Sequence, residues 1–186
     1  MLHSYEPEKL LNRNVKRDFF RKLFLRSLIS LAIAFTLYLA TVTFLVFPVK
    51  VVSHAMKPNY EFDSTVYVSP RFSYASLAIG DVILIRHPYQ KDKLFLSRIV
   101  GKAGDSIEIR NKKVLRNRQT LQLKTKVIHT DKRAALPTSI STRDRQKKAK
   151  VGAKQFYVLS DNRDEAFDSR EMGAVPLEQV VGKVVF

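Results

Sequence analysis

The sequence predicts a mostly β domain that follows one N-terminal transmembrane α-helix. Residues 27–47 carry no charged side chain, whereas most of the later chain consists of short alternating or apolar runs separated by Pro, Gly, Asn and Asp. No long amphipathic helical pattern competes with these runs. The 186 residues suffice for one modest domain beside the helix.

The run from Ser27 to Phe47 has the length of a membrane-spanning helix. At about 1.5 Å per residue it crosses a hydrocarbon layer of about 30 Å. A buried core helix is one alternative, but little else in so short a chain is available to cover all of its faces. A cleaved signal peptide is another, although no small-x-small cleavage site follows Phe47. We therefore expect an uncleaved anchor.

Basic side chains flank this run unequally. Those before it are Lys9, Arg13, Lys16, Arg17, Arg21, Lys22 and Arg26, and those after it within a comparable distance are Lys50 and Lys57. Positive charges near the end of a spanning helix stay in the cytoplasm. The expected organisation is a basic cytoplasmic segment at 1–26, a transmembrane helix at 27–47 and an extracytoplasmic β domain at 48–186.

Nine strands are expected in that domain, and no cofactor. The strands are predicted at residues 49–52, 65–68, 81–85, 94–100, 106–109, 112–115, 120–127, 155–159 and 180–186. The chain has no cysteine, which excludes disulfides and thiolate metal sites. The four histidines, His3, His54, His87 and His129, lie far apart in sequence without metal-ligand spacing.

Residues 110–150, here called the basic segment, hold much of the formal net charge of +16. Fourteen lysines and arginines stand there against only Asp131 and Asp144. A solvated loop, a surface for anionic lipid or an acidic protein partner, and a nucleic-acid patch all fit this composition. An extracytoplasmic location makes nucleic acid an unlikely partner.

Three segments resemble the sequence motifs of bacterial type I signal peptidases, which are membrane serine proteases. They are Val-Ser-His-Ala-Met-Lys-Pro at 52–58, Leu-Phe-Leu-Ser-Arg-Ile-Val-Gly-Lys-Ala-Gly-Asp at 94–105, and Phe-Tyr-Val-Leu-Ser-Asp-Asn-Arg-Asp-Glu-Ala-Phe-Asp-Ser-Arg at 156–170. The resemblance covers roughly residues 44–186. It implies a signal-peptidase-like β-fold, with 110–150 as a variable insertion, in a bacterial cytoplasmic membrane.

The family's catalytic positions are substituted in this chain. The serine that attacks the peptide bond falls on Ala55, whose methyl group has no lone pair to offer. The lysine that acts as general base falls on Ser97, and a serine hydroxyl does not take a proton near neutral pH. The serine that supports this lysine falls on Ala166. The resemblance thus leaves no intact catalytic residue.

The third motif is otherwise well matched, which favours a structural role. The matching residues are Asp161, Asn162, Arg163, Asp168, Ser169 and Arg170. Aspartate and asparagine cap turns through backbone N–H groups. We expect Arg163 or Arg170 to pair with a carboxylate such as Asp168 or Asp161.

The resemblance also implies where a peptide binds. In the family an extended peptide lies between two strand edges, which correspond here to Val51-Val52-Ser53 and Phe95-Leu96-Ser97, with small pockets for alanine-like side chains. Strand addition uses main-chain hydrogen bonds and needs no catalytic dyad. Ser53 stands where many members place an oxyanion-binding hydroxyl.

Two functions remain open at this stage. The preferred one is an inactive signal peptidase homologue that binds a signal peptide, another extended peptide, or a membrane or secretory protein at the outer face of the membrane. The alternative is an active, divergent signal peptidase that cleaves leader peptides with another catalytic set. Ser53 with His54, or a lysine such as Lys57 or Lys102, would have to supply that set.

Overall fold

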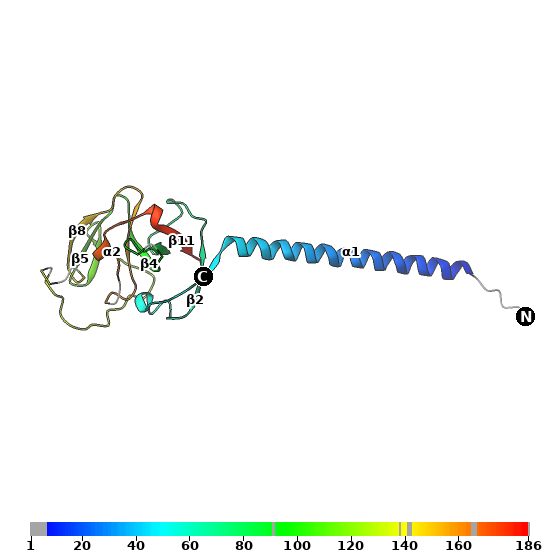
Figure 1. The fold of residues 1–186 in the computed structure, drawn as a ribbon, viewed down its shortest axis with the longest axis horizontal. Coiled ribbons are helices and arrows are strands. Elements are labelled where there is room, and N and C mark those ends of the chain that lie inside the picture. The colour runs from blue at the N-terminus through cyan, green and yellow to red at the C-terminus, as the bar shows by residue number, and fades with distance from the viewer. Residues whose placement is uncertain (1–6, 91, 138, 141–142, 165–166, 186) are drawn as a thin grey trace, which may run out of the picture. The chain divides into compact units, whose positions relative to one another are not determined.

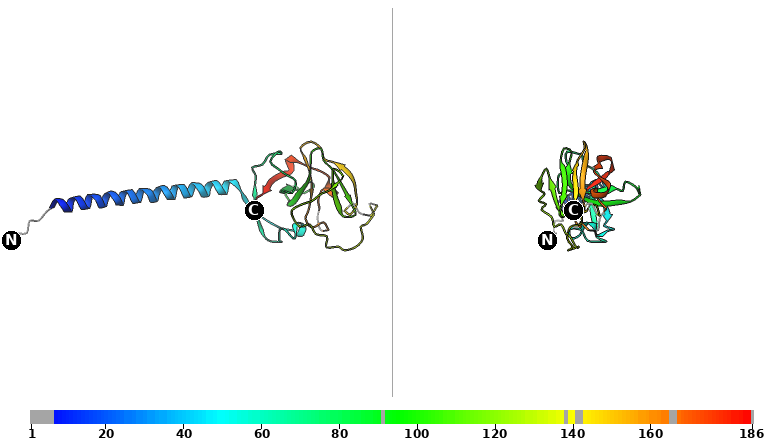
Figure 2. Two further views of the ribbon diagram at one scale, coloured as in Figure 1. Left: turned by 180° about the vertical axis from the view of Figure 1, so that it is seen from behind. Right: turned by 90° about the vertical axis from the view of Figure 1, so that its left-hand side faces the viewer.

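The computed structural model describes residues 7–90, 92–137, 139–140, 143–164 and 167–185. It contains a helical unit that ends at Phe44 and a compact unit that begins at Leu45. All named strands belong to the compact unit (Figures 1 and 2). The prediction of a mostly β fold with an N-terminal helix is confirmed.

The helical unit is a single continuous helix, α1 (Pro7–Leu45) (Figure 1). Its stretch Arg17–Ala40 has a mean hydropathy of 1.9 and is long and apolar enough to cross a membrane. The helix starts well before Ser27, so the N-terminal stretch at 7–26, which precedes the apolar run, is helical too. It ends before Phe47 because a residue that precedes proline, here Pro48, is disfavoured in helical conformation.

Seven antiparallel strands form the main sheet, in the order β1-β2-β11-β3-β4-β9-β10. They are β1 (Phe47–Lys50), β2 (Thr65–Ser69), β3 (Val82–Arg86), β4 (Leu94–Lys102), β9 (Gln155–Leu159), β10 (Val175–Pro176) and β11 (Val180–Val184). Short helices η1 (His54–Met56), α2 (Ser169–Met172) and η2 (Leu177–Gln179) connect them. The central strands β3 and β4 are mostly buried, and β4 carries the buried polar residues Ser97 and Arg98 among its apolar ones.

A second sheet has the order β7-β6-β5-β8 and contains much of the basic segment. Its strands are β5 (Ser106–Arg110), β6 (Lys113–Arg116), β7 (Gln119–Thr120) and β8 (Gln146–Lys150). The predicted strand at 120–127 is wrong, since only Gln119–Thr120 pairs with β6. The sequence did not indicate β8, in which every residue but Ala149 is polar and which is held by backbone pairing with β5.

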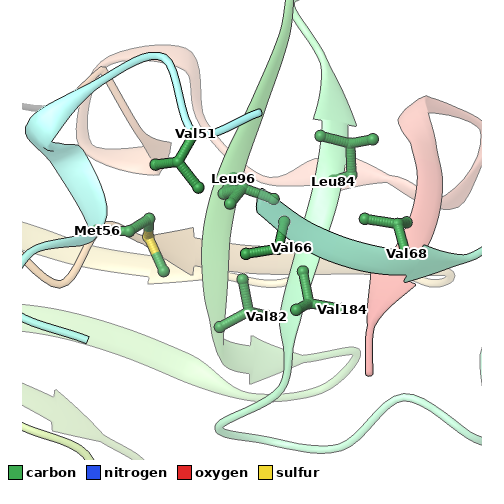
Figure 3. Close-up of a cluster of buried hydrophobic side chains, with 8 residues drawn as sticks. All are labelled: Val51, Met56, Val66, Val68, Val82, Leu84, Leu96 and Val184. Carbon is green, nitrogen blue, oxygen red and sulfur yellow. The ribbon is translucent and has the colours of Figure 1, made fainter. Parts of the chain in front are cut away.

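Three apolar clusters fill the compact unit. The one nearest the motifs contains Val51, Met56, Val66, Val68, Val82, Leu84, Leu96 and Val184 (Figure 3). Met56 comes from η1 and Leu96 from β4, and both are almost fully buried. Their packing in one cluster holds η1 against β4, and so holds the first motif against the second.

Asp105 joins the turn after β4 to the second sheet. Its carboxylate accepts hydrogen bonds from the Lys102 N–H at 2.8 Å, the Arg116 Nε at 2.8 Å and the Asn117 Nδ2 at 2.7 Å. Burial acts to raise the pKa of Asp105, but these hydrogen bonds outweigh it and hold the pKa below its ordinary value of 3.8. A carboxylate of this kind stabilises the folded state above its unfolded pKa.

We expect Asp105→Asn to lower the free energy of unfolding at neutral pH by about 1–3 kcal/mol, because the charge-assisted hydrogen bonds weaken. The difference should shrink as the pH falls through the lowered pKa of Asp105, where the native carboxyl becomes neutral too. Denaturant unfolding of the detergent-purified chain, followed by tyrosine fluorescence across pH, measures both effects. Glu108→Gln, at an exposed ion pair with Arg110, is the control and should change little; an Asp105→Asn effect no larger than that of the control would contradict this role.

Candidate functional site

The first motif forms a tight turn rather than a strand edge. The strand predicted over 49–52 ends at Lys50, and Val51 uses its N–H and C=O to bond Ser64 and Asp63. Ser53 caps η1, with its Oγ accepting a hydrogen bond from the Ala55 N–H at 3.4 Å. The expected edge at Val51 is therefore already occupied by the protein's own backbone.

Ala55 is linked directly to the third motif. Its carbonyl oxygen accepts a hydrogen bond from the Asn162 N–H at 2.9 Å. Its side chain is a partly exposed methyl group, which supplies neither a nucleophile nor a hydrogen bond.

Ser97 lies in the interior of β4, opposite Ile83 of β3, with no exposed surface. Its Oγ has no hydrogen-bond partner. A buried hydroxyl without a partner costs free energy and has no base beside it to remove its proton. This position therefore contributes no acid–base chemistry.

Arg98, the next residue, joins β4 to the third motif. Its guanidinium makes a two-bonded pair with Asp161, from Nε to Oδ1 at 2.7 Å and from Nη2 to Oδ2 at 2.5 Å. Its Nη1 donates to the Gly80 carbonyl at 2.6 Å. Asn59, just after the first motif, donates from Nδ2 to Asp161 at 2.8 Å. One buried carboxylate thus connects all three motifs.

A second buried pair lies within the third motif. Asp168 caps α2 and accepts hydrogen bonds from both Nε and Nη2 of Arg170 at 2.8 Å. The Ser169 hydroxyl accepts a hydrogen bond from the Val158 N–H of β9 at 2.9 Å. Arg163 forms an ion pair with neither Asp161 nor Asp168. Of the two arginines expected to pair within this motif, it is Arg170 that does so. Ala166, at the supporting-serine position, lies outside the described residues.

The edge of β4 at residues 94–97 is open. β9 pairs with β4 only from Arg98 onward, and no described strand lies beside 94–97 on that side. Ile99 directs its N–H and C=O toward the β3 side, to Asp81 and Gly80. Because backbone groups alternate in direction along a strand, those of Leu94 and Leu96 face the open edge.

Five of the six expected peptide-binding residues meet at one narrow cleft. Val51, Val52, Ser53, Phe95 and Leu96 line it, and Ser97 does not. The volume open to water is about 20 Å³, which is room for about one water molecule. The side-chain pockets implied by the resemblance are therefore closed here. The rim is apolar, since Val52 is 72% and Leu94 39% exposed.

The residues considered as substitute catalysts are engaged elsewhere. Lys57 pairs with Glu61 at 3.2 Å. Lys102 donates from Nζ to the carbonyls of Tyr74 and Leu77 at 3.0 and 2.6 Å. The His54 ring packs on Phe62, with ring centroids 5.0 Å apart.

Sequence reasoning missed two features of this region. One is Asn59, whose bond to Asp161 joins residues too distant in sequence for any local pattern to indicate. The other is an aromatic group beside the open edge, in which Phe167 stacks on His87 with ring centroids 4.7 Å apart and also meets Phe95 at 6.4 Å. Its members come from three separate parts of the chain.

Proteins of known family are similar to this chain over most of its length. A family model described as signal peptidase, peptidase S26, matches residues 24–186. Signal peptidase IB of Staphylococcus aureus strain COL is 27% identical over 178 residues, which cover 89% of this chain and 90% of that protein.

Other likenesses cover less of the chain. The probable thylakoidal processing peptidase 2, chloroplastic, of Arabidopsis thaliana is 31% identical over 104 residues, which cover 56% of this chain and 25% of that protein. The chain thus spans about a quarter of that relative's length. A crystal structure of a signal peptidase I from Enterococcus faecalis V583 has a TM-score of 0.43 at 19% identity, covering 59% of this chain and 97% of that one.

We expect Asp161→Asn to lower the free energy of unfolding by about 3–5 kcal/mol, because it leaves the buried Arg98 charge without its partner. The matched control is Asp63→Asn. It removes the exposed pair with Lys50 and should cost less than about 1 kcal/mol; asparagine also tolerates the positive φ of Asp63. Equal effects of the two variants in denaturant unfolding would show that Asp161 does not brace the three motifs.

Proposed function

The chain belongs to the signal peptidase family, peptidase S26, and we propose that it binds extended peptides without hydrolysing them. The binding surface is the open edge of β4, and the ligand is a signal peptide or an extended segment of a membrane or secretory protein. The protein acts at the outer face of a bacterial cytoplasmic membrane, held there by α1.

The observation that carries this proposal is the pair Ala55 and Ser97. Hydrolysis by the family's chemistry needs an activated hydroxyl and a base that takes its proton, and neither position supplies its part. The bonds of Lys57 and Lys102 to other groups argue against a substitute base. The alternative of an active, divergent signal peptidase has no described residue to support it.

Peptide binding is supported by the backbone groups of Leu94 and Leu96. An unpaired edge accepts an added strand through main-chain hydrogen bonds, and these bonds do not depend on a nucleophile. The exposed apolar side chains at Val52 and Leu94 suit an apolar peptide better than a charged one. The narrow cleft suggests that recognition depends on this edge and its rim rather than on a deep side-chain pocket.

The unaltered chain should cleave a preprotein no faster than buffer does, in detergent and beside an active family member. Ala55→Ser alone should gain less than about tenfold, since the residues of a catalytic network act together. Ala55→Ser with Ser97→Lys should give the first measurable cleavage, and Ala166→Ser should increase it. The lysine enters a packed core at a cost of about 1–3 kcal/mol, so the recovered activity should be partial. Cleavage at a leader junction by the unaltered chain would falsify the proposal.

Photo-crosslinking probes at Val52 and Leu94 should capture peptide or protein in living cells. Leu94 is the suitable position on β4, because Leu96 is buried. A probe at Lys148, which is exposed on β8 of the basic segment, is the control and should capture less. Capture by Lys148 alone would mean that the basic segment, and not the β4 edge, is the binding surface.

A further inference from the structure

A cavity of about 560 Å³ lies beside the second sheet, apart from the narrow cleft. Its walls come from β6, from the residues that follow β7, and from Arg163 of the third motif. It shares no lining residue with the cleft. The volume is in the range of small-molecule binding sites.

Arg163 differs from the other two buried arginines near the motifs. Arg98 is paired with Asp161 and Arg170 with Asp168, whereas Arg163 has no ion-pair partner among the described residues. Arg163 is only 4% exposed, and its Nε has no hydrogen-bond partner. A buried charge without a partner is costly, so an arginine in this state calls for an anion.

The charge of Arg163 is present at neutral pH. Burial lowers its pKa to about 10, with the attraction of Asp168 acting in the opposite direction. Since both nearby carboxylates are already engaged by other arginines, neither offers it the two-bonded geometry that a guanidinium makes with an oxyanion.

A second orphaned polar atom lines the same cavity. The Thr125 Oγ1 is buried without a hydrogen-bond partner. Of the four buried side-chain atoms without partners in the described part of the chain, two belong to residues that line this cavity, Arg163 and Thr125. A guanidinium and a hydroxyl together supply the donors that bind carboxylate or phosphate oxygens.

The remaining walls are basic, apolar or neutral polar, the last at Thr120 and Gln122. Lys113 adds positive charge, and Lys112 is held by the carbonyls of Asp131 and Arg133 at 2.8 and 3.0 Å. Burial lowers the pKa of His129, with the nearby Asp164 acting in the opposite direction, and this favours the neutral ring. Asp164 itself is bound by Thr130 and the Asp131 N–H. The apolar lining consists of Val114, Leu121, Leu123 and Val127.

We propose that this cavity binds a small oxyanion that carries an apolar substituent, with Arg163 as its countercharge and Thr125 as a hydrogen-bond donor. The apolar walls hold the substituent, and the carboxylate or phosphate group is the part that all such ligands share. The site is independent of peptide binding at β4.

The test is thermal unfolding of the detergent-purified full chain at constant ionic strength. The probes are inorganic phosphate, acetate, hexanoate, and vesicles of phosphatidylglycerol or phosphatidylcholine. A ligand that binds only the native state stabilises it by RT ln(1 + L/Kd) at a free ligand concentration L, so the Tm rises with the logarithm of that concentration once it exceeds the Kd. Hexanoate should bind at least about tenfold more tightly than acetate, because its additional methylene groups contact the apolar wall. If only phosphatidylglycerol vesicles raised the Tm, the positive charge of Arg163 would serve a membrane surface, and the proposed cavity site would be overturned.

Variants separate a ligand site from a structural arginine. Arg163→Gln should abolish the rise in Tm with hexanoate and should raise the Tm of the free protein, since the unpaired buried charge is gone. Thr125→Val keeps the shape of the side chain and adds no charge, and it should weaken the binding of hexanoate severalfold. Lys148→Gln, on β8 outside the cavity, should leave hexanoate binding unchanged. Retention of the hexanoate effect in both Arg163→Gln and Thr125→Val, or no stabilisation of the unaltered chain by any probe, overturns the proposal.

Discussion

The buried pair between Arg98 and Asp161 is the interaction on which the rest of the compact unit depends. It joins the middle of β4 to the loop that follows β9, and Asn59 attaches the turn after the first motif to the same carboxylate. The neighbouring Asn162 N–H then holds the Ala55 carbonyl. Because both charges are withdrawn from water, removing either one leaves the other uncompensated. This one ion pair therefore links all three motifs.

In this member of the signal peptidase family, structural support comes from residues other than Ala55 and Ser97. The bracing residues Asp161, Asp168 and Arg170 make buried pairs that stabilise the fold whether or not a peptide bond is cleaved. In the proposed function, Ala55 and Ser97 stand at the positions of the family's nucleophile and general base. The open edge of β4 does not depend on either side chain, and it is the basis of the proposed peptide binding.

The sequence indicated the features that depend on local patterns. The apolar run in α1 and most strands of the main sheet follow from composition and spacing. For the pair of Asp168 with Arg170 the sequence offered only a set of alternatives, among which the structure adopts one. Features set by tertiary contacts could not be predicted from the sequence. The turn at Val51 arises because Ser64 and Asp63 take its backbone groups, and the polar strand β8 exists only through pairing with β5. The partner of Arg98 lies 63 residues away, and the orphaned state of Arg163 depends on which carboxylates its neighbours take.

The most direct test of the central claim is residue-resolved amide hydrogen exchange with a signal peptide, followed by mass analysis of the recovered peptide. The Leu96 N–H faces the open edge and should exchange more slowly when peptide is present, whereas the Ser97 N–H faces β3 and should exchange as before. The peptide should be recovered whole. Unchanged exchange at Leu96, or a peptide cut at a single junction, would contradict the account of this chain as a binding scaffold without protease chemistry.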